Sequence, residues 1–146
     1  MQVTIMGLGY IGLPTAALIA SKGISVHGVD VNKSVVDTIN KGKIHIVEPD
    51  LDGLVHFAVL KKYLTASTTV KASDVFLIAV PTPFRKDHKP DLSFVEKATK
   101  MVIPQLKPGN LFIIESTSPV GTTEKMSKLI FKERPELKDK IWIAYC

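Results

Sequence analysis

The chain has 146 residues and is 45% hydrophobic, which suits one packed domain. Its net charge is +5, but the lysines are scattered, so the sequence lacks the focused basic patch that a nucleic-acid partner requires. The only cysteine, Cys146, excludes an internal disulfide and a multi-cysteine metal site. The histidines are spread out, and we expect structural or surface roles for them: His27, His45, His56 and His88.

The first predicted strand, Val3 to Met6, leads directly into Gly7-x-Gly9-x-x-Gly12, and a helix from Leu13 to Lys22 follows. In this order Gly7 permits a tight turn, because a β-carbon would clash there. Gly9 lets the backbone approach a pyrophosphate, and Gly12 lets the helix pack close to the strand. The free N–H groups at the start of the helix then face the phosphates. The pattern predicts a dinucleotide-binding site.

A second predicted strand, Ser25 to Val29, ends at Asp30. A carboxylate there can accept hydrogen bonds from a ribose diol and repels a 2′-phosphate. No arginine stands at residues 31–33 to hold such a phosphate, so the sequence predicts NAD rather than NADP as the cofactor. The alternative is a glycine turn in another kind of α/β protein, with Asp30 as the N-cap of a helix that begins near Asn32.

The segment from Val3 to Ala20 carries no charge, which raises the alternative of a membrane span. Three glycines and Pro14 within it argue against that alternative, and no basic residue precedes it, which argues against a signal peptide. We expect a soluble, cytoplasmic protein with neither a membrane nor a nucleic-acid partner.

The remaining predicted elements alternate between helices at 33–41, 51–61, 92–105 and 122–133 and strands at 64–67, 75–80, 111–114 and 141–145. An irregular connector spans 43–50, a polar loop spans 85–90, and Asp91 is the predicted cap of the third of these helices. This alternation predicts an α/β Rossmann fold, a doubly wound six-stranded parallel sheet with strand order 3-2-1-4-5-6. Two loops then lie on the ligand-facing edge, Pro81-Thr82-Pro83 and Ser116-Thr117.

Five segments together resemble the UDP-glucose/GDP-mannose dehydrogenase family. They are Gly7 to Pro14, Gly28 to Asp30, Glu48 to Leu51, Ala79 to Pro83 and Glu115 to Thr122. They cover the whole chain in the family's order and spacing. Within the family, the stretches from His45 to Leu51 and from Ser67 to Thr69 are similar to the UDP-N-acetyl-D-mannosamine dehydrogenase branch, whereas the UDP-glucose branch usually has Gly where this chain has Pro81.

The resemblance implies an NAD-dependent enzyme of surface polysaccharide synthesis. Such enzymes oxidise UDP-N-acetyl-D-mannosamine to UDP-N-acetyl-D-mannosaminuronate with two NAD per turnover. The family's catalytic cysteine lies far beyond residue 146, so Cys146 is not that nucleophile. By the resemblance, residues 1–146 are the NAD-binding Rossmann domain of a longer enzyme, without its central helix and UDP-sugar domain. A homodimer would form through that central region, and no catalytic residue is expected within this chain.

By the family pattern, the positions that match NAD contacts are Tyr10, Ile11, Asp30, Thr82 and Thr123. Thr117 matches a position near the nicotinamide, where its hydroxyl could assist by positioning water or substrate. Each threonine could instead be a satisfied cap or turn residue. Glu115 is an acid–base candidate, with an ion pair or a cap as the alternative.

Two other functions stay open from the sequence. One is a different sugar specificity, for UDP-glucose or UDP-N-acetylglucosamine, because the sugar pocket lies mostly outside these residues. The other is a stand-alone nucleotide-sensing Rossmann module. Such a module gives no role to the loops at 81–83 and 115–117, so the sequence favours the enzyme.

Overall fold

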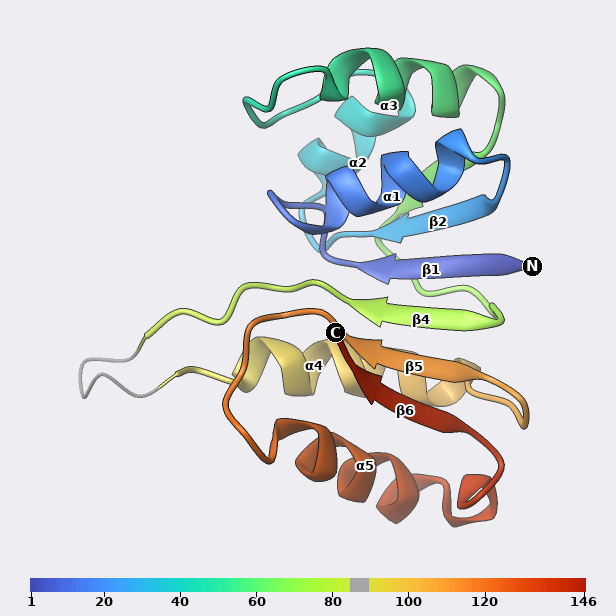
Figure 1. Cartoon of the computed structure of the whole chain (residues 1–146), viewed down its shortest axis with the longest axis vertical. Coiled ribbons are helices and arrows are strands. Elements are labelled where there is room, and N and C mark those ends of the chain that lie inside the picture. Colours follow the sequence, from blue (N-terminus) through green and yellow to red (C-terminus); the bar gives the residue numbers. More distant parts are fainter. Residues whose placement is uncertain (85–89) are drawn as a thin grey trace.

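The computed structural model describes residues 1–84 and 90–146, and one parallel sheet runs through it (Figure 1). Its strands are β1 (Gln2–Met6), β2 (Ser25–Val29), β3 (Leu64–Ser67), β4 (Val75–Ile78), β5 (Leu111–Ile114) and β6 (Trp142–Tyr145). Their order, β3-β2-β1-β4-β5-β6, confirms the predicted Rossmann topology. Every strand ends at the same edge of the sheet, and the glycine motif and the loops after β4 and β5 meet there (Figure 1).

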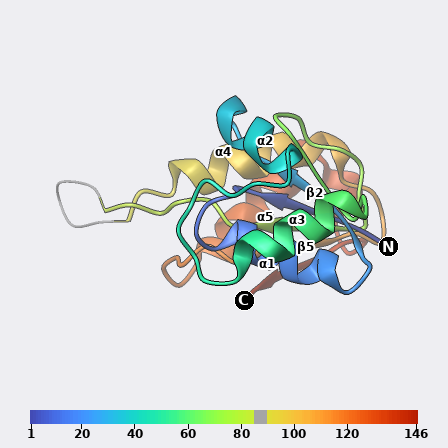
Figure 2. The same ribbon diagram turned by 90° about the horizontal axis from the view of Figure 1, so that it is seen from above.

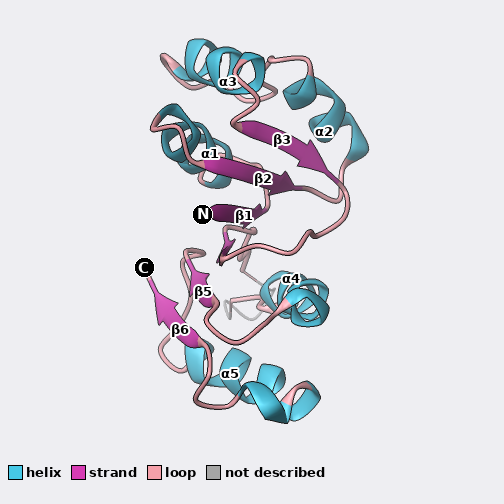
Figure 3. Ribbon diagram, turned by 90° about the vertical axis from the view of Figure 1, so that its right-hand side faces the viewer, coloured by secondary structure: helices cyan, strands magenta, loops and turns pink. Residues whose placement is uncertain are grey.

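The helices cover the two faces of the sheet. They are α1 (Gly12–Ser21), α2 (Lys33–Asn40), α3 (Leu51–Leu60), α4 (Ser93–Val102) and α5 (Thr122–Glu133), with short 3-10 turns at Ile103–Gln105 and Pro135–Leu137. α1 and α3 lie on one face and α4 lies on the opposite face (Figures 2 and 3). A buried apolar cluster forms on each side, one around Ile5, Leu13 and Leu77 and the other around Phe76, Phe112 and Ile130.

The central strands are apolar because both of their faces are covered. In β4, Phe76 and Ile78 pack into the α4–α5 side, whereas Leu77 packs into the α1–α3 side. The ladder stops at Ile78, two residues before the predicted end of the strand. The Ile78 carbonyl accepts from the N–H groups of both Glu115 and Ser116, at 2.9 and 3.0 Å, so the segment after β5 leaves the regular ladder at this point.

The predicted helix at 92–105 is divided in the structure. α4 ends at Val102, and a 3-10 turn continues to Gln105, because Pro104 has no N–H to sustain α-helical bonding. The predicted cap at Asp91 lies one residue too early, because the N-cap residue of α4 is Leu92, which makes no side-chain capping bond. Oδ1 of Asp91 accepts from the Ser93 N–H at 3.0 Å. The connector at 43–50 contains no helix or strand. Most of the polar loop predicted at 85–90 lies outside the described residues.

His27 is buried within the sheet and is fully hydrogen-bonded. Its Nε2–H donates to the Thr69 carbonyl at 3.1 Å, and its Nδ1 lies 3.2 Å from the Thr65 hydroxyl. Burial lowers the pKa of His27 below its usual value, with Lys71 adding a smaller effect in the same direction against the opposing bond to Thr69. This histidine therefore has the structural role that was predicted, while His45 and His56 are exposed and His88 lies outside the described residues.

Candidate dinucleotide-binding site

The three motif glycines meet three different steric conditions. Gly7 has φ +91°, and a β-carbon there would lie 2.6 Å from the Ala79 carbonyl oxygen. A β-carbon at Gly12 would lie 1.9 Å from the Gly7 carbonyl oxygen. A β-carbon at Gly9, in contrast, would meet no atom within 4 Å. Gly7 and Gly12 are therefore required by the fold itself, whereas Gly9 borders open space, which is what a closely bound phosphate needs.

The first turn of α1 is open to an anion. The N-cap residue Ile11 makes no side-chain capping bond, and the first turn has no acidic residue. The N–H groups that start a helix carry a partial positive charge, and in this turn the Leu13 N–H donates to the Gly9 carbonyl at 3.1 Å while Pro14 has no N–H. Tyr10 and Ile11, at the tip of the loop before α1, are 64% and 57% exposed. This end of the helix can therefore receive a pyrophosphate.

Asp30 anchors the glycine loop to the end of β2. Its Oδ2 accepts from the Leu8 N–H at 3.0 Å and its Oδ1 from the Asn32 N–H at 2.9 Å. The alternative role as N-cap of α2 is wrong, because Asn32 caps that helix through Ser34 N–H at 3.0 Å. A carboxylate has about four acceptor sites, so Asp30 can still accept bonds from two ribose hydroxyls.

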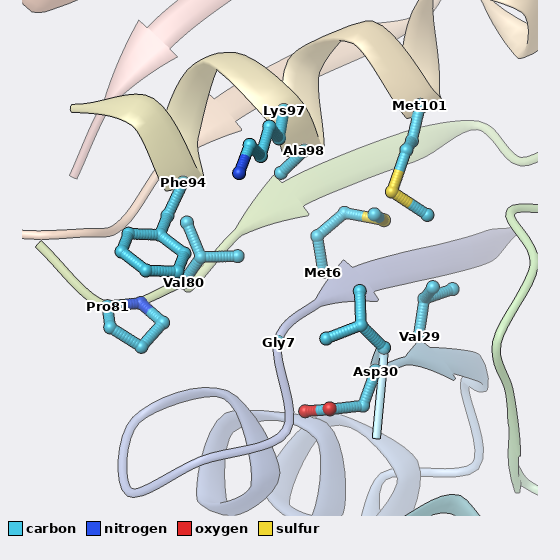
Figure 4. A pocket seen from close by; sticks show the side chains of 11 residues that line it. Met6, Gly7, Val29, Asp30, Val80, Pro81, Phe94, Lys97, Ala98 and Met101 are labelled. Atoms are coloured by element: carbon cyan, nitrogen blue, oxygen red, sulfur yellow. The ribbon is translucent and has the colours of Figure 1, made fainter. Parts of the chain in front are cut away.

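A cavity of about 370 Å³ opens beside Asp30, between the end of β2 and α4 (Figure 4). This volume is within the usual range for small-molecule sites, about 300–1,000 Å³. Most of its lining is apolar; the lining residues are Met6, Gly7, Val29, Asp30, Val31, Val80, Pro81, Phe94, Lys97, Ala98 and Met101. An apolar slot with a carboxylate at one side suits a planar base joined to a ribose.

The sequence reasoning missed the α4 side of this cavity. Phe94, Lys97 and Met101 recur three or four residues apart, so they lie on one face of the helix. The signal was present, because this stripe runs beside the buried positions Val95 and Ala98 that were identified. Gly28 was noted only as part of a segment, yet a β-carbon there would lie 2.7 Å from the Leu8 side chain.

The loops after β4 and β5 are tied together. The Thr82 hydroxyl donates to the Thr117 carbonyl at 2.7 Å, and the Ser116 hydroxyl donates to the Val80 carbonyl at 2.7 Å. Thr82 and Thr117, predicted to lie on the ligand-facing edge, are thus brought together there. Thr123 lies apart from them, in the first turn of α5, where it lines a separate hollow with Ser127 and Ile143.

Glu115 lies at the carboxyl end of β5 beside α1. The Thr15 hydroxyl donates to its Oε1 at 3.0 Å, while its Oε2 is buried without a hydrogen-bond partner. Within residues 1–84 and 90–146 the carboxylate forms no ion pair and caps no helix. The same described residues contain no group of three or more His, Cys, Asp or Glu side chains that could hold a metal ion, and no helix long and apolar enough to cross a membrane.

Together, the glycine turn, the uncapped helix and the carboxylate at the end of β2 define a dinucleotide-binding Rossmann domain. The family model for the NAD binding domain of the UDP-glucose/GDP-mannose dehydrogenase family matches residues 1–146. The chain belongs to this family, as the NAD-binding domain.

Curated relatives carry two different sugar names. The chain is 58% identical, over 99% of its length, to UDP-N-acetyl-D-mannosamine dehydrogenase of Campylobacter jejuni. It is 55% identical, also over 99%, to NDP-N-acetyl-D-galactosaminuronic acid dehydrogenase of Ralstonia nicotianae. The chain spans 38% and 36% of the lengths of these two proteins.

The fold is also similar to that of a solved dehydrogenase. The native structure of UDP-N-acetyl-mannosamine dehydrogenase from Staphylococcus aureus matches 92% of this chain with a TM-score of 0.88 and 40% sequence identity. That match covers 33% of the solved chain. The similarity in fold therefore extends over nearly all of this chain and over one part of the larger protein.

Proposed function

We propose that residues 1–146 act as the NAD-binding domain of a longer nucleotide-sugar 6-dehydrogenase that oxidises UDP-N-acetyl-D-mannosamine to UDP-N-acetyl-D-mannosaminuronate with two NAD. The observation that carries the cofactor part is the geometry at Gly9 and Asp30. Open space at Gly9 adjoins the first turn of α1, and Asp30 holds the glycine loop while keeping acceptor sites free. NAD, when bound, supplies the hydride acceptor.

The predicted site residues near the glycine turn bind different parts of the cofactor in this proposal. Gly7, Gly9 and Gly12 shape the turn around the pyrophosphate, and Asp30 accepts bonds from the adenosine ribose hydroxyls. The cavity beside Asp30 takes the adenine, because its apolar walls favour a flat, uncharged ring. Tyr10 and Ile11 lie at the exposed tip of the glycine loop, where they can contact the cofactor.

The loops after β4 and β5 serve the nicotinamide end in this proposal. β4 and β5 lie on the opposite side of β1 from β2, so an extended dinucleotide that starts at Asp30 reaches them. Thr82 and Thr117 line that route, and Thr117, an exposed residue, assists by orienting water or substrate with its hydroxyl. Thr123 is retained as a cofactor contact from the family pattern.

The sugar, the assembly and the location are also proposals. High identity to UDP-N-acetyl-D-mannosamine dehydrogenases supports the mannosamine sugar, while the Ralstonia relative supports testing other sugars. A role in surface polysaccharide synthesis follows from a uronate product of this type. We propose a homodimer of the longer protein, formed outside residues 1–146, and a cytoplasmic location, where NAD and nucleotide sugars are both available.

Two measurements test the proposal. Calorimetry of the 146-residue protein with NAD and NADP is expected to show tighter binding of NAD. The second measurement uses a longer protein, in which this domain is joined to the further regions that its longer relatives have. Its rate of NADH production is measured across a panel of UDP-sugars, and we expect the highest rate with UDP-N-acetyl-D-mannosamine. A faster rate with UDP-glucose or UDP-N-acetylglucosamine would assign the alternative sugar. Binding of NAD with no activity on any sugar would favour a nucleotide-sensing module.

A further inference from the structure

The cavity beside Asp30 carries two charged side chains from opposite walls. Asp30 follows β2 on one wall, and Lys97 projects from α4 on the other (Figure 4). Among the described residues that line the cavity, Lys97 is the sole cation. Asp30 already has a task in the proposed function, whereas Lys97 has none.

The Lys97 ammonium lies close to an aromatic ring in the same wall. Its Nζ is 5.9 Å from the centroid of the Phe94 ring, within the range of a cation–π contact. Phe94 is one turn before Lys97 on α4, and both side chains point toward the cavity (Figure 4). The cation is therefore held at the edge of an apolar slot.

The chemistry of the cavity limits what Lys97 can meet there. A phosphate inside the slot would lie against the negative charge of Asp30 and against apolar walls, which disfavours it. A purine base is uncharged, flat and largely apolar, so it fits the walls. It also offers a π face and unprotonated ring nitrogens, and an ammonium group is attracted to the first and donates hydrogen bonds to the second.

We propose that Lys97, together with Phe94, is a base-recognition residue that contacts the adenine of the cofactor through its ammonium group. This inference rests on the proposed function, because it places the adenosine half of NAD in the cavity. It adds a favourable polar contact to the base, which apolar walls alone do not supply. Lys97 then contributes to the affinity for adenine nucleotides and not to the affinity for phosphate in general.

The test compares two competitors of NADH that share a phosphate and differ in the base. Displacement of NADH from the 146-residue protein by 5′-AMP and by ribose 5-phosphate is measured through the change in NADH fluorescence. Lys97→Met is expected to weaken 5′-AMP binding by about two- to tenfold and to leave ribose 5-phosphate binding unchanged. Lys100→Met is the matched control, since Lys100 is exposed on the same helix and does not line the cavity. It is expected to leave both affinities unchanged.

Three outcomes overturn the inference. They are an equal loss for both competitors, no loss for either, and a loss for 5′-AMP in Lys100→Met as large as in Lys97→Met. The first and third would mean a general effect of net charge. Lys97→Arg keeps a cation and serves as a second variant, so retention of 5′-AMP affinity by Arg but not by Met supports the contact. Failure of the unaltered protein to bind NADH contradicts the proposed function itself and removes the basis of this inference.

Discussion

The Thr82 hydroxyl donates a 2.7 Å hydrogen bond to the carbonyl of Thr117, a residue 35 positions later, and so joins the loops after β4 and β5. Because the ladder between the two strands stops at Ile78 and Ile114, this side-chain bond holds together the loops beyond it. Thr82→Val removes the donor with little change in volume. We expect the free energy of unfolding to fall by about 1 kcal/mol in urea denaturation. Thr82→Ser keeps the hydroxyl, and a loss as large in that variant would contradict this role.

The open space at Gly9 leads to a second prediction. Gly9→Val is expected to abolish NADH binding while leaving the circular dichroism spectrum unchanged, because an added β-carbon has no protein atom within 4 Å and the side chain would fill the space of the pyrophosphate. Gly53→Val is the control, since Gly53 also has no atom within 4 Å of an added β-carbon and lies on α3, away from the site. A folded Gly9→Val protein that still binds NADH would reduce Gly9 to a turn residue.

Replacing Asp30, the carboxylate at the end of β2, is expected to weaken the binding of NAD. Asp30→Ala removes the charged acceptor of hydrogen bonds from the ribose hydroxyls, which corresponds to a loss of about 1.5–3 kcal/mol in the binding free energy measured by calorimetry with NAD. The difference between NAD and NADP affinities should also shrink, because the charge that repels the 2′-phosphate is gone. Asp52→Ala removes an exposed acid from α3 and should change neither affinity. Equal NAD and NADP affinities in the unaltered protein would refute the assignment of NAD.

The buried His27 makes stability depend on pH. Its folded-state pKa is lowered below the ordinary 6.5, mainly by burial, so this histidine binds a proton more readily in the unfolded chain than in the folded protein. Stability from this group is complete above the unfolded value and declines as the pH falls below it. We expect the loss of unfolding free energy from about pH 7.5 to about pH 5.5 to be smaller in His27→Gln than in the unaltered protein. His45→Gln, at an exposed site, should retain the full loss.

The 146-residue polypeptide is expected to produce no NADH from UDP-N-acetyl-D-mannosamine and NAD. The proposed oxidation of an alcohol to a carboxylate needs a base, a nucleophile for the aldehyde and a substrate held in near-attack geometry. The only cysteine, Cys146, is exposed after β6, and Thr117 is the one hydroxyl assigned an assisting role. A steady rate that is lost in Cys146→Ser would show that the chemistry resides in this chain after all.

Local patterns were enough to predict the sheet and the glycine turn after β1. The strand order follows from the alternation of strands and helices, and the requirement for glycine at position 12 is local, because a β-carbon there would meet the Gly7 carbonyl oxygen five residues earlier. Contacts between distant segments were not predictable in the same way. The bonds from Thr15 to Glu115 and from Thr82 to Thr117 join residues 100 and 35 positions apart. They depend on how far α1 and the two loops reach across the sheet.

The cavity beside Asp30 also depends on contacts between distant segments, which local sequence patterns do not predict. Helical spacing identified Val95, Ala98 and Val102 as the buried side of α4, and this was confirmed. It could not show that the neighbouring stripe of Phe94 and Lys97 faces Asp30, because that depends on the angle at which α4 crosses the strands. The division of the predicted helix at Pro104 has a local cause, and the missing N–H could have identified it.

Leu8 is fixed from two sides before any ligand arrives. Its side chain packs in the notch left by Gly28 of β2, and its N–H is bound to Asp30. The conformational entropy of the phosphate-binding loop is therefore lost when the protein folds and not when the cofactor binds. Enlarging Gly28 would displace Leu8 and return that entropic cost to the binding step, so affinity for a dinucleotide would depend on a residue that never touches it.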